Sequence, residues 1–238
     1  MRIALLSDMH SNRQGLDAAV QALQSRDVDT IWSPGDFVDY GADPGYVLDW
    51  VMDNVDHAVL GNHDAVVVGK ESSHYFNKYA KQAIPYTQKQ ITETQKEWLE
   101  KLSYVEVIDG IRLVHASPGT PEDWTYIMSP SHALHFFDVF DEQVCIFGHT
   151  HVQVIYDSSG RVHFDSGVEL EDGVQYLVNP GSTGQPRDGD PRWGCAVYDT
   201  DANTIELLRG EYDIDAAANA IYQANLPDFL GDRLYRGR

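Results

Sequence analysis

Short apolar runs, each closed by a glycine or a polar residue, constrain the fold of this chain most strongly. The runs at 3–6, 58–60 and 144–147 are examples. Between the first two of them, apolar residues recur at the spacing of amphipathic helices, at 16–23 and 46–55. This alternation of strand and helix patterns predicts an α/β protein with a mostly parallel sheet.

The rest of the chain carries different patterns. Residues 72–103 are rich in Lys, Gln and Glu, and we predict two helices there, forming a cap-like insert. The stretch from 152 to 208 is rich in strand and turn signals, which predicts a second sheet of antiparallel character. A hairpin is expected to turn at Asp109 and Gly110. Since no repeat or low-complexity linker divides the sequence, we expect a single domain over 1–238.

Charge and hydropathy exclude several classes of partner. The 238 residues include 37 acidic and 17 basic side chains, a formal net charge of −20. Such a surface repels nucleic acid phosphates and gives no reason to expect an anionic membrane as partner. The run at 3–6 is shorter than the roughly 7–15 apolar residues of a secretory signal, and no run approaches the ~20 of a membrane span. We therefore expect a cytoplasmic protein in which Cys145 and Cys195 are buried free thiols; a disulfide is the alternative.

Polar residues that can bind metals follow the apolar runs. They are Asp8, His10, Asp36, Asn62, His115, His149 and His151. In open α/β sheets, ligands bind outside the carboxyl ends of the strands, so these residues would converge if their strands were neighbours in one sheet. Asp8 and His10, like His149 and His151, are two residues apart, and in extended chain such pairs point to the same side.

The donor types and their number indicate a metal site. Imidazole and carboxylate without convergent cysteines suit Mn, Fe, Zn, Ni or Co. Seven donors are too many for one four-coordinate ion, but two ions that share a carboxylate could use them. Each motif alone also has a structural explanation, such as a turn at "GNHD" (61–64). Their joint occurrence at successive strand ends favours the metal site.

The ordered motifs also carry a family resemblance. "DMH" (8–10), "GDFVDYG" (35–41), "GNHD" (61–64), "HASPG" (115–119) and "GHTH" (148–151) resemble the calcineurin-like metallophosphoesterase family. Within it, the chain is similar to the small single-domain prokaryotic phosphoesterases, from residue 3 to about 208. The resemblance implies a four-layer α/β/β/α sandwich of two facing mixed sheets.

The resemblance further implies a role for each matching residue. Asp8, His10, Asp36 and His151 would hold one divalent ion, and Asp36, Asn62, His115 and His149 the other; we favour manganese. His63 matches the catalytic histidine, and Asp64 could orient its ring. The implied activity is hydrolysis of a phosphomonoester or phosphodiester, a small phosphate-ester substrate, by direct attack of a hydroxide that bridges the two metals.

Other residues and other functions remain open. Arg187, in "GQPRDGD", could clamp a phosphate, or it could be a loop arginine paired with Asp188 or Asp190. Trp124 and Tyr126 could line a substrate cleft or join the core, and Asp39 is interpreted as a turn residue or as support for the ligands. The alternative functions are a non-catalytic protein-interaction scaffold of the same fold and a nuclease of the same family. The acidic surface argues against the nuclease.

Overall fold

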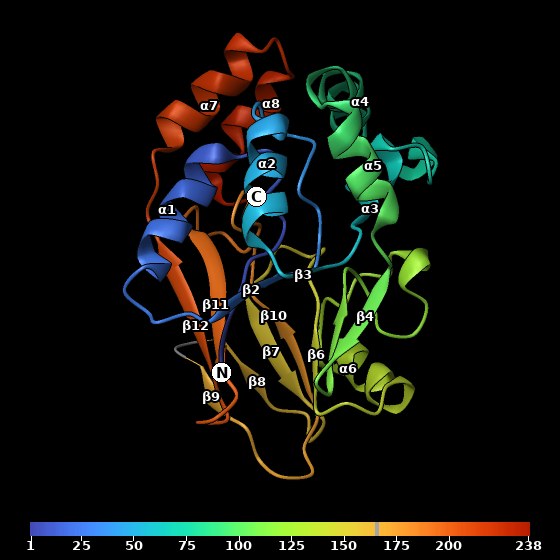
Figure 1. Ribbon diagram of the computed structural model, residues 1–238, viewed down its shortest axis with the longest axis vertical. Coiled ribbons are helices and arrows are strands. Elements are labelled where there is room, and N and C mark those ends of the chain that lie inside the picture. Colours follow the sequence, from blue (N-terminus) through green and yellow to red (C-terminus); the bar gives the residue numbers. More distant parts are fainter. Residues whose placement is uncertain (165–166) are drawn as a thin grey trace.

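Two six-stranded sheets face each other, and helices cover the outer side of each sheet (Figure 1). The computed structural model describes residues 1–164 and 167–238. The first sheet has the spatial order β3 (His57–Ala58), β2 (Thr30–Ser33), β1 (Arg2–Leu5), β11 (Trp193–Asp199), β12 (Thr204–Gly210) and β9 (Val168–Glu169). The second has the order β4 (Val105–Ile108), β5 (Ile111–Val114), β6 (Val144–Ile146), β10 (Tyr176–Asn179), β7 (Val154–Asp157) and β8 (Val162–His163).

Both sheets are mixed, which confirms the expected four-layer sandwich. β1, β2 and β3 run parallel, as do β5, β6 and β10, and the other strands pair antiparallel. The prediction that 152–208 forms a second sheet by itself is wrong, because its strands divide between the two sheets. β9, β11 and β12 extend the first sheet beside β1, whereas β7, β8 and β10 join the second beside β6. A strand pattern shows which residues share a face of the strand, but not which other strand it pairs with.

Burial on both faces explains the apolar runs. In β1, Ile3 and Leu5 face the other sheet, whereas Ala4, and Leu6 just after the strand, face the helices outside. β6 repeats this arrangement, with Val144 turned inward. A strand that is covered on both sides has no polar face, so its sequence reads as a continuous apolar run.

Three helices cover the outer face of the first sheet: α1 (Arg13–Leu23), α2 (Pro44–Asn54) and α7 (Ile214–Gln223). In α1, Leu16, Ala19 and Leu23 form the buried stripe, and the Asn12 side chain caps the helix by accepting from the Gly15 N–H. The two helices expected in 72–103 are present as α4 (Lys78–Gln90) and α5 (Glu93–Lys101), after a short helix η1 (Ser73–Tyr75). That they act as a cap, and that 1–238 is one domain, remain predictions.

The outer face of the second sheet is covered by α6 (Pro130–Ala133) and the 3-10 helix η3 (Leu134–Val139), on the side away from α1 and α7 (Figure 1). β4 and β5 form the predicted hairpin, with Asp109 and Gly110 at φ 50° and 78° in its turn. In the described part of the chain, every helix is too short or too polar to span a membrane.

The two cysteines are free and buried, as expected. Cys145 lies in the outer layer of the second sheet and Cys195 in the outer layer of the first, so the two sheets separate them. Burial raises the pKa of both thiols, that of Cys195 to about 12. Both therefore remain protonated at neutral pH.

Asp157, at the end of β7, is a buried carboxylate with an unusual number of donors. Its oxygens accept from the backbone N–H groups of Ser159 and Arg161, the Ser159 hydroxyl, the Arg161 guanidinium and the His163 ring. Burial alone would raise the pKa of Asp157, but these hydrogen bonds outweigh it and hold the pKa at about 2.

Replacing Asp157 with asparagine is expected to lower the free energy of unfolding by about 2 kcal/mol at pH 7. Because the folded-state pKa lies below the ordinary 3.8, this stability is present above about pH 4 and is lost as the pH falls toward 2. Urea unfolding at pH 7 and pH 3 measures it, and the difference from wild type should shrink by about half at pH 3. Asp172→Asn, in an exposed turn, is the control; an equal cost for both would contradict the prediction.

Candidate metal centre

The polar residues that follow the strands converge between the two sheets. Asp8, Asp36 and Asn62 follow β1, β2 and β3, whereas the three histidines His115, His149 and His151 follow β5 and β6. The residues thus converge although their strands are not all neighbours in one sheet. Parallel strands of two facing sheets supply the cluster, because both sets end at the same side of the sandwich.

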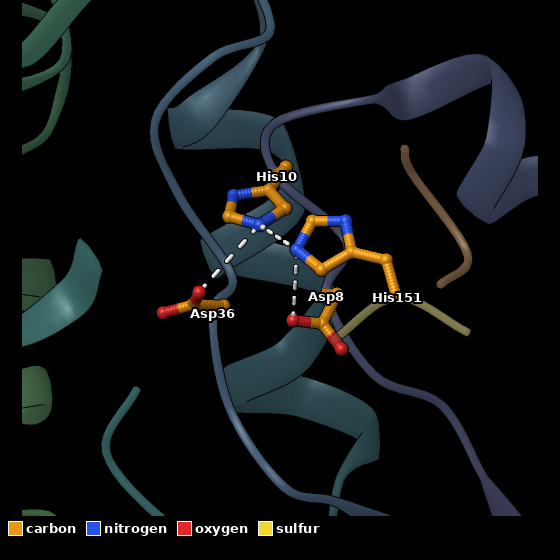
Figure 2. A group of neighbouring side chains, drawn as sticks. All are labelled: Asp8, His10, Asp36 and His151. Carbon is orange, nitrogen blue, oxygen red and sulfur yellow. Dashed lines mark hydrogen bonds and ion pairs between the residues drawn. The ribbon is translucent and has the colours of Figure 1, made fainter. Parts of the chain in front are cut away.

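Asp36 belongs to two groups of possible metal ligands. Asp8, His10, Asp36 and His151 place one ligand atom each within 4.8 Å of one another, and Asp36, His115 and His149 do the same (Figure 2 shows the first group). Asn62 joins the second group, since its Oδ1 lies 3.1 Å from His115 Nε2. All seven residues are buried. The structure thus brings together the whole predicted set and divides His149 and His151 between the two groups.

Backbone carbonyls fix the orientation of all four histidines. A carbonyl only accepts hydrogen bonds, so the ring nitrogen facing it carries the hydrogen and the other nitrogen is turned toward the carboxylates. The four contacts are His10 Nδ1 to Val38 O (2.9 Å), His115 Nδ1 to Pro34 O (2.8 Å), His149 Nε2 to Trp124 O (3.0 Å) and His151 Nδ1 to Gln185 O (2.6 Å). Metal-binding histidines have this second hydrogen bond as a rule.

The first group has an electrostatic conflict that a cation would relieve. His10 Nε2 lies 3.1 Å from His151 Nε2. Burial lowers the pKa of both rings well below the ordinary value, so both are neutral. Two lone pairs therefore face each other, with the carboxylates of Asp8 and Asp36 beside them at 3.3 and 3.5 Å. A divalent cation bound by these four side chains would remove the repulsion, so the donor set fits a metal.

The second group holds a proton where a cation could bind. His115 Nε2 lies 3.2 Å from both Asp36 Oδ2 and His149 Nδ1. Burial alone would lower the pKa of His115, but the charge of Asp36 and the hydrogen bond to it raise the pKa to about 9. The same ring holds the pKa of Asp36 well below its ordinary value, against the effect of burial. A divalent cation could replace this proton, because the same donors would surround it.

The backbone around the centre adopts conformations that the sequence pattern did not reveal. Asp8, His10, Asp36, His149 and His151 all have φ between 45° and 66°. Few residues other than glycine adopt this region, and Asp, Asn and His tolerate it best. The expectation that the two pairs lie in extended chain is wrong: tight left-handed turns bring their side chains together. Strain of this kind collects at functional sites.

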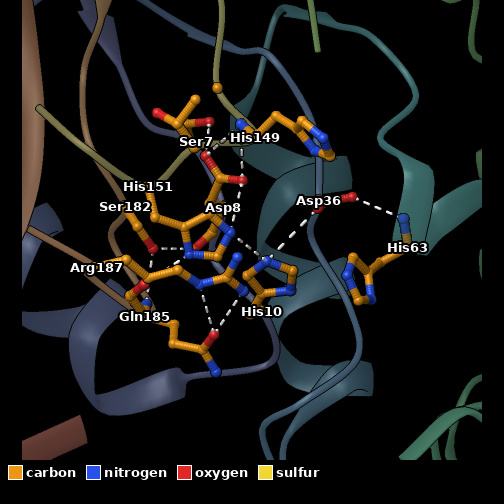
Figure 3. Close-up of polar contacts among 12 residues, drawn as sticks. Ser7, Asp8, His10, Asp36, His63, His149, His151, Ser182, Gln185 and Arg187 are labelled. Atoms are coloured by element: carbon orange, nitrogen blue, oxygen red, sulfur yellow. Dashed lines mark hydrogen bonds and ion pairs between the residues drawn. The ribbon is translucent and has the colours of Figure 1, made fainter. Parts of the chain in front are cut away.

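Backbone N–H groups hold both carboxylates in place (Figure 3). The His149 N–H donates to Asp8 at 3.1 and 3.2 Å, and the His63 N–H donates to Asp36 Oδ1 at 2.9 Å. Gly61 allows this approach, since a Cβ there would lie 2.1 Å from Asp36 Oδ1. The glycine of "GNHD" is thus required by the close packing of Asp36.

His63 is oriented by Asp39, and the prediction that Asp64 orients it is wrong. His63 Nδ1 lies 2.7 Å from Asp39 Oδ2. The Asp64 carboxylate instead accepts from four backbone N–H groups, those of Asp36, Phe37, Val38 and Gly61. Asp64 lies in the first turn of α3 (Asn62–Val67) and therefore points back at the loop after β2. It shapes the loop that carries Asp36.

Arg187 lies beside the centre and is not paired with its acidic neighbours. Its guanidinium donates to Gln185 Oε1 at 2.8 and 3.2 Å, and its backbone N–H donates to His151 O at 3.1 Å (Figure 3). Asp188 pairs with Arg209 and Asp190 with Arg192, so the alternative that Arg187 pairs with either is wrong. A contact of Arg187 with substrate remains a prediction.

A cleft of about 600 Å³ opens beside the centre. Asn62, His63 and His149 are among its lining residues. Trp124 and Tyr126 also line it, and Trp124 in addition belongs to the core, so both roles considered for it from the sequence apply. The rest of its wall consists of Tyr40, Glu71, Tyr75, Phe76, Asn77, Glu122 and Asp123. The cleft joins an aromatic wall and three carboxylates to the second ligand group, through Asn62 and His149.

Several known proteins are similar to this chain in sequence and in fold. The family model of the calcineurin-like phosphoesterase superfamily domain matches residues 1–203. An uncharacterized protein of Methanocaldococcus jannaschii is 38% identical over 242 residues, covering 99% of this chain and 98% of that protein. The crystal structure of a metallophosphoesterase from Sphaerobacter thermophilus is 34% identical, with a TM-score of 0.90 over 100% of this chain and 99% of the other. A symmetrical bis(5′-nucleosyl)-tetraphosphatase of Salmonella paratyphi B is 28% identical over 127 residues, which is 52% of this chain and 45% of that enzyme.

Proposed function

The chain belongs to the calcineurin-like phosphoesterase superfamily, and on that premise we propose that it hydrolyses small phosphate esters with two divalent cations. Asp8, His10 and His151 would bind one cation, Asn62, His115 and His149 the other, and Asp36 both. The observation that carries this proposal is the position of Asp36 between two sets of histidines whose ring orientation is already fixed by the backbone.

The donor set also bears on which metal binds. Imidazole and carboxylate suit Mn, Fe, Zn, Ni and Co, and we favour manganese among them. When bound, two such cations supply a hydroxide nucleophile near neutral pH and offset the charge on the phosphate oxygens. The described residues around the centre hold both carboxylates through backbone N–H groups, so the ligands are positioned before any cation binds.

His63 is the residue that we assign to proton transfer. Its Nδ1 is engaged by Asp39, so Nε2 is the nitrogen left to pass a proton to the leaving oxygen. The Asp39 carboxylate holds the ring in the orientation that this role needs. The rings of Tyr40 and Phe76, at 4.5 and 4.3 Å, hold the imidazole at the edge of the cleft.

The cleft favours a small ester over a nucleic acid. Its aromatic wall would receive the organic group of a monoester or diester, while the phosphate lies between the ligand groups and Arg187. The net charge of −20 and the carboxylates of Glu71, Glu122 and Asp123 in the wall would repel a polynucleotide.

Removal of metal is expected to abolish activity. Wild-type protein should hydrolyse p-nitrophenyl phosphate or bis-p-nitrophenyl phosphate with Mn²⁺, lose turnover after treatment with EDTA, and regain it with Mn²⁺. Elemental analysis of the loaded protein should give two metals per chain. Folded protein that turns over neither ester with Mn, Fe, Zn, Ni or Co would contradict the activity. Turnover with one bound metal would contradict only the second cation.

A further inference from the structure

Two arginines from distant parts of the chain converge on the ring of Tyr40. The guanidinium carbon of Arg187 lies 5.5 Å from the centroid of that ring, and that of Arg233 lies 5.8 Å from it. Arg187 belongs to the loop between β10 and β11, whereas Arg233 directly follows α8 (Asp228–Asp232). Arg233 lies beyond residues 1–203, which match the family model, so the family resemblance gives no expectation for it.

Neither guanidinium is paired with an Asp or Glu side chain among the ion pairs of residues 1–164 and 167–238. Arg187 donates to the neutral amide of Gln185, and Arg233 donates to the backbone oxygen of Arg238. Exposed arginines nearby, such as Arg192, are paired with aspartates. In a chain with 37 acidic residues and 17 basic ones, Arg187 is thus left beside the centre without an acidic side chain as partner.

The two guanidinium groups are close enough to influence each other. Burial, and after it the positive charge of Arg187, lowers the pKa of Arg233 to about 10. Like charges in a partly buried place repel, and an anion between them would offset both. An anion bound between the two groups would therefore stabilise the pair.

This pair of arginines adjoins the metal centre. The Tyr40 ring on which both converge lies 4.7 Å from the ring of His10 and 4.5 Å from that of His63. The backbone N–H of Arg187 is bonded to the carbonyl of His151. An anion held by the two guanidinium groups would thus lie next to a phosphate bound at the centre.

We propose that Arg187 and Arg233 form a second anion subsite, which binds a further phosphate group of the substrate beside the phosphate that is hydrolysed. This rests on the proposed function of the centre. The substrate would then carry at least two phosphate groups. Guanidinium groups suit this role because their N–H groups match phosphate oxygens in pairs.

Two observations favour a further phosphate over a second contact to the hydrolysed one. Two cations and His63 would take up oxygens of the hydrolysed phosphate, which leaves little of it for the donors of Arg233 to bind. The wall of the cleft carries Glu71, Glu122 and Asp123, which would repel a second phosphate. Of these two places beside the centre, only the arginine pair attracts an anion.

Titration calorimetry of phosphate and of pyrophosphate tests the subsite without requiring turnover. With Mn²⁺-loaded protein at a fixed concentration of free Mn²⁺, wild type should bind pyrophosphate at least about tenfold more tightly than phosphate. Arg233→Gln should lose most of this preference and change the affinity for phosphate by less than about threefold, and Arg233→Lys should keep part of it. Each protein is first checked for an unchanged melting temperature and metal content.

Arg236→Gln is the matched control, because Arg236 is an exposed arginine on the neighbouring helix η4 (Leu234–Arg236). It should bind both anions as wild type does, and chelation of Mn²⁺ by pyrophosphate would affect all variants alike. The subsite is overturned if Arg233→Gln keeps the wild-type preference, or if Arg236→Gln loses as much. Failure of the proposed function would appear separately, as absence of ester hydrolysis by wild-type protein.

Discussion

Asp36→Asn is expected to lower kcat by about 10³-fold or more and to reduce the metal content of the protein at both positions. Asp36 is the only member shared by the two ligand groups among the described residues, and its Oδ2 lies 3.2 Å from His115 Nε2 and 3.5 Å from His10 Nε2. Asparagine keeps the shape and an oxygen for the His63 N–H, but it loses the negative charge that both groups use. Elemental analysis and p-nitrophenyl phosphate turnover measure the two effects.

Single-group variants provide the control for this result. His151→Asn and His149→Asn each alter one group only, so each should lose one metal and leave the other bound. Circular dichroism should show that all three variants remain folded, because none of the three side chains belongs to the apolar clusters of the core. An Asp36→Asn protein that retained two tightly bound metals per chain would show that Asp36 does not join the two sites.

His63→Gln is expected to lower kcat by about 10²- to 10⁴-fold while both metals stay bound. His63 contributes no ring nitrogen to either ligand group; its Nδ1 is bonded to Asp39 and its ring borders the cleft. A proton donor matters most when the leaving oxygen is basic. The loss should therefore be larger with an alkyl phosphate such as glycerol 2-phosphate than with p-nitrophenyl phosphate.

Two comparisons decide what a loss at His63 means. His74→Gln, at an exposed histidine of η1, should leave turnover unchanged. Asp39→Asn should reduce turnover by about tenfold with the same dependence on the leaving group, since Asp39 acts by positioning His63. Equal activity of wild type and His63→Gln would refute the assigned role. A wild-type protein that binds metals but turns over no ester would instead favour the non-catalytic scaffold.

The motif "GNHD" does not reveal which aspartate contacts His63. Both aspartates lie near His63 in the fold, and Asp64 is its neighbour in sequence. Adjacent residues at the start of a helix point in different directions, so adjacency in sequence gives no information about the contact. Asp64 turns back to four N–H groups of the preceding loops, whereas Asp39 reaches the ring from the loop after β2.

The sequence by itself determined the buried strands and the chemistry that follows them. A strand covered on both faces must be apolar throughout. The runs at 3–6 and 144–147 could therefore be recognised as buried strands from the sequence alone. The polar residues just beyond these runs identified the donors of the centre, because little else explains histidines and aspartates at several strand ends. The turn at Asp109 and Gly110 could also be predicted, because it depends on these two neighbouring residues alone.

Only the tertiary structure decided how these parts meet. It divided the strands of 152–208 between two sheets, since alternation fixes faces but not partners. It brought the ligands together from facing sheets through left-handed turns, which no apolar pattern encodes. It also placed Arg233 beside Arg187 at Tyr40. Contacts between residues far apart in the chain depend on how whole layers pack. A single sequence shows which residues make up each helix and strand, but not which other elements they pack against.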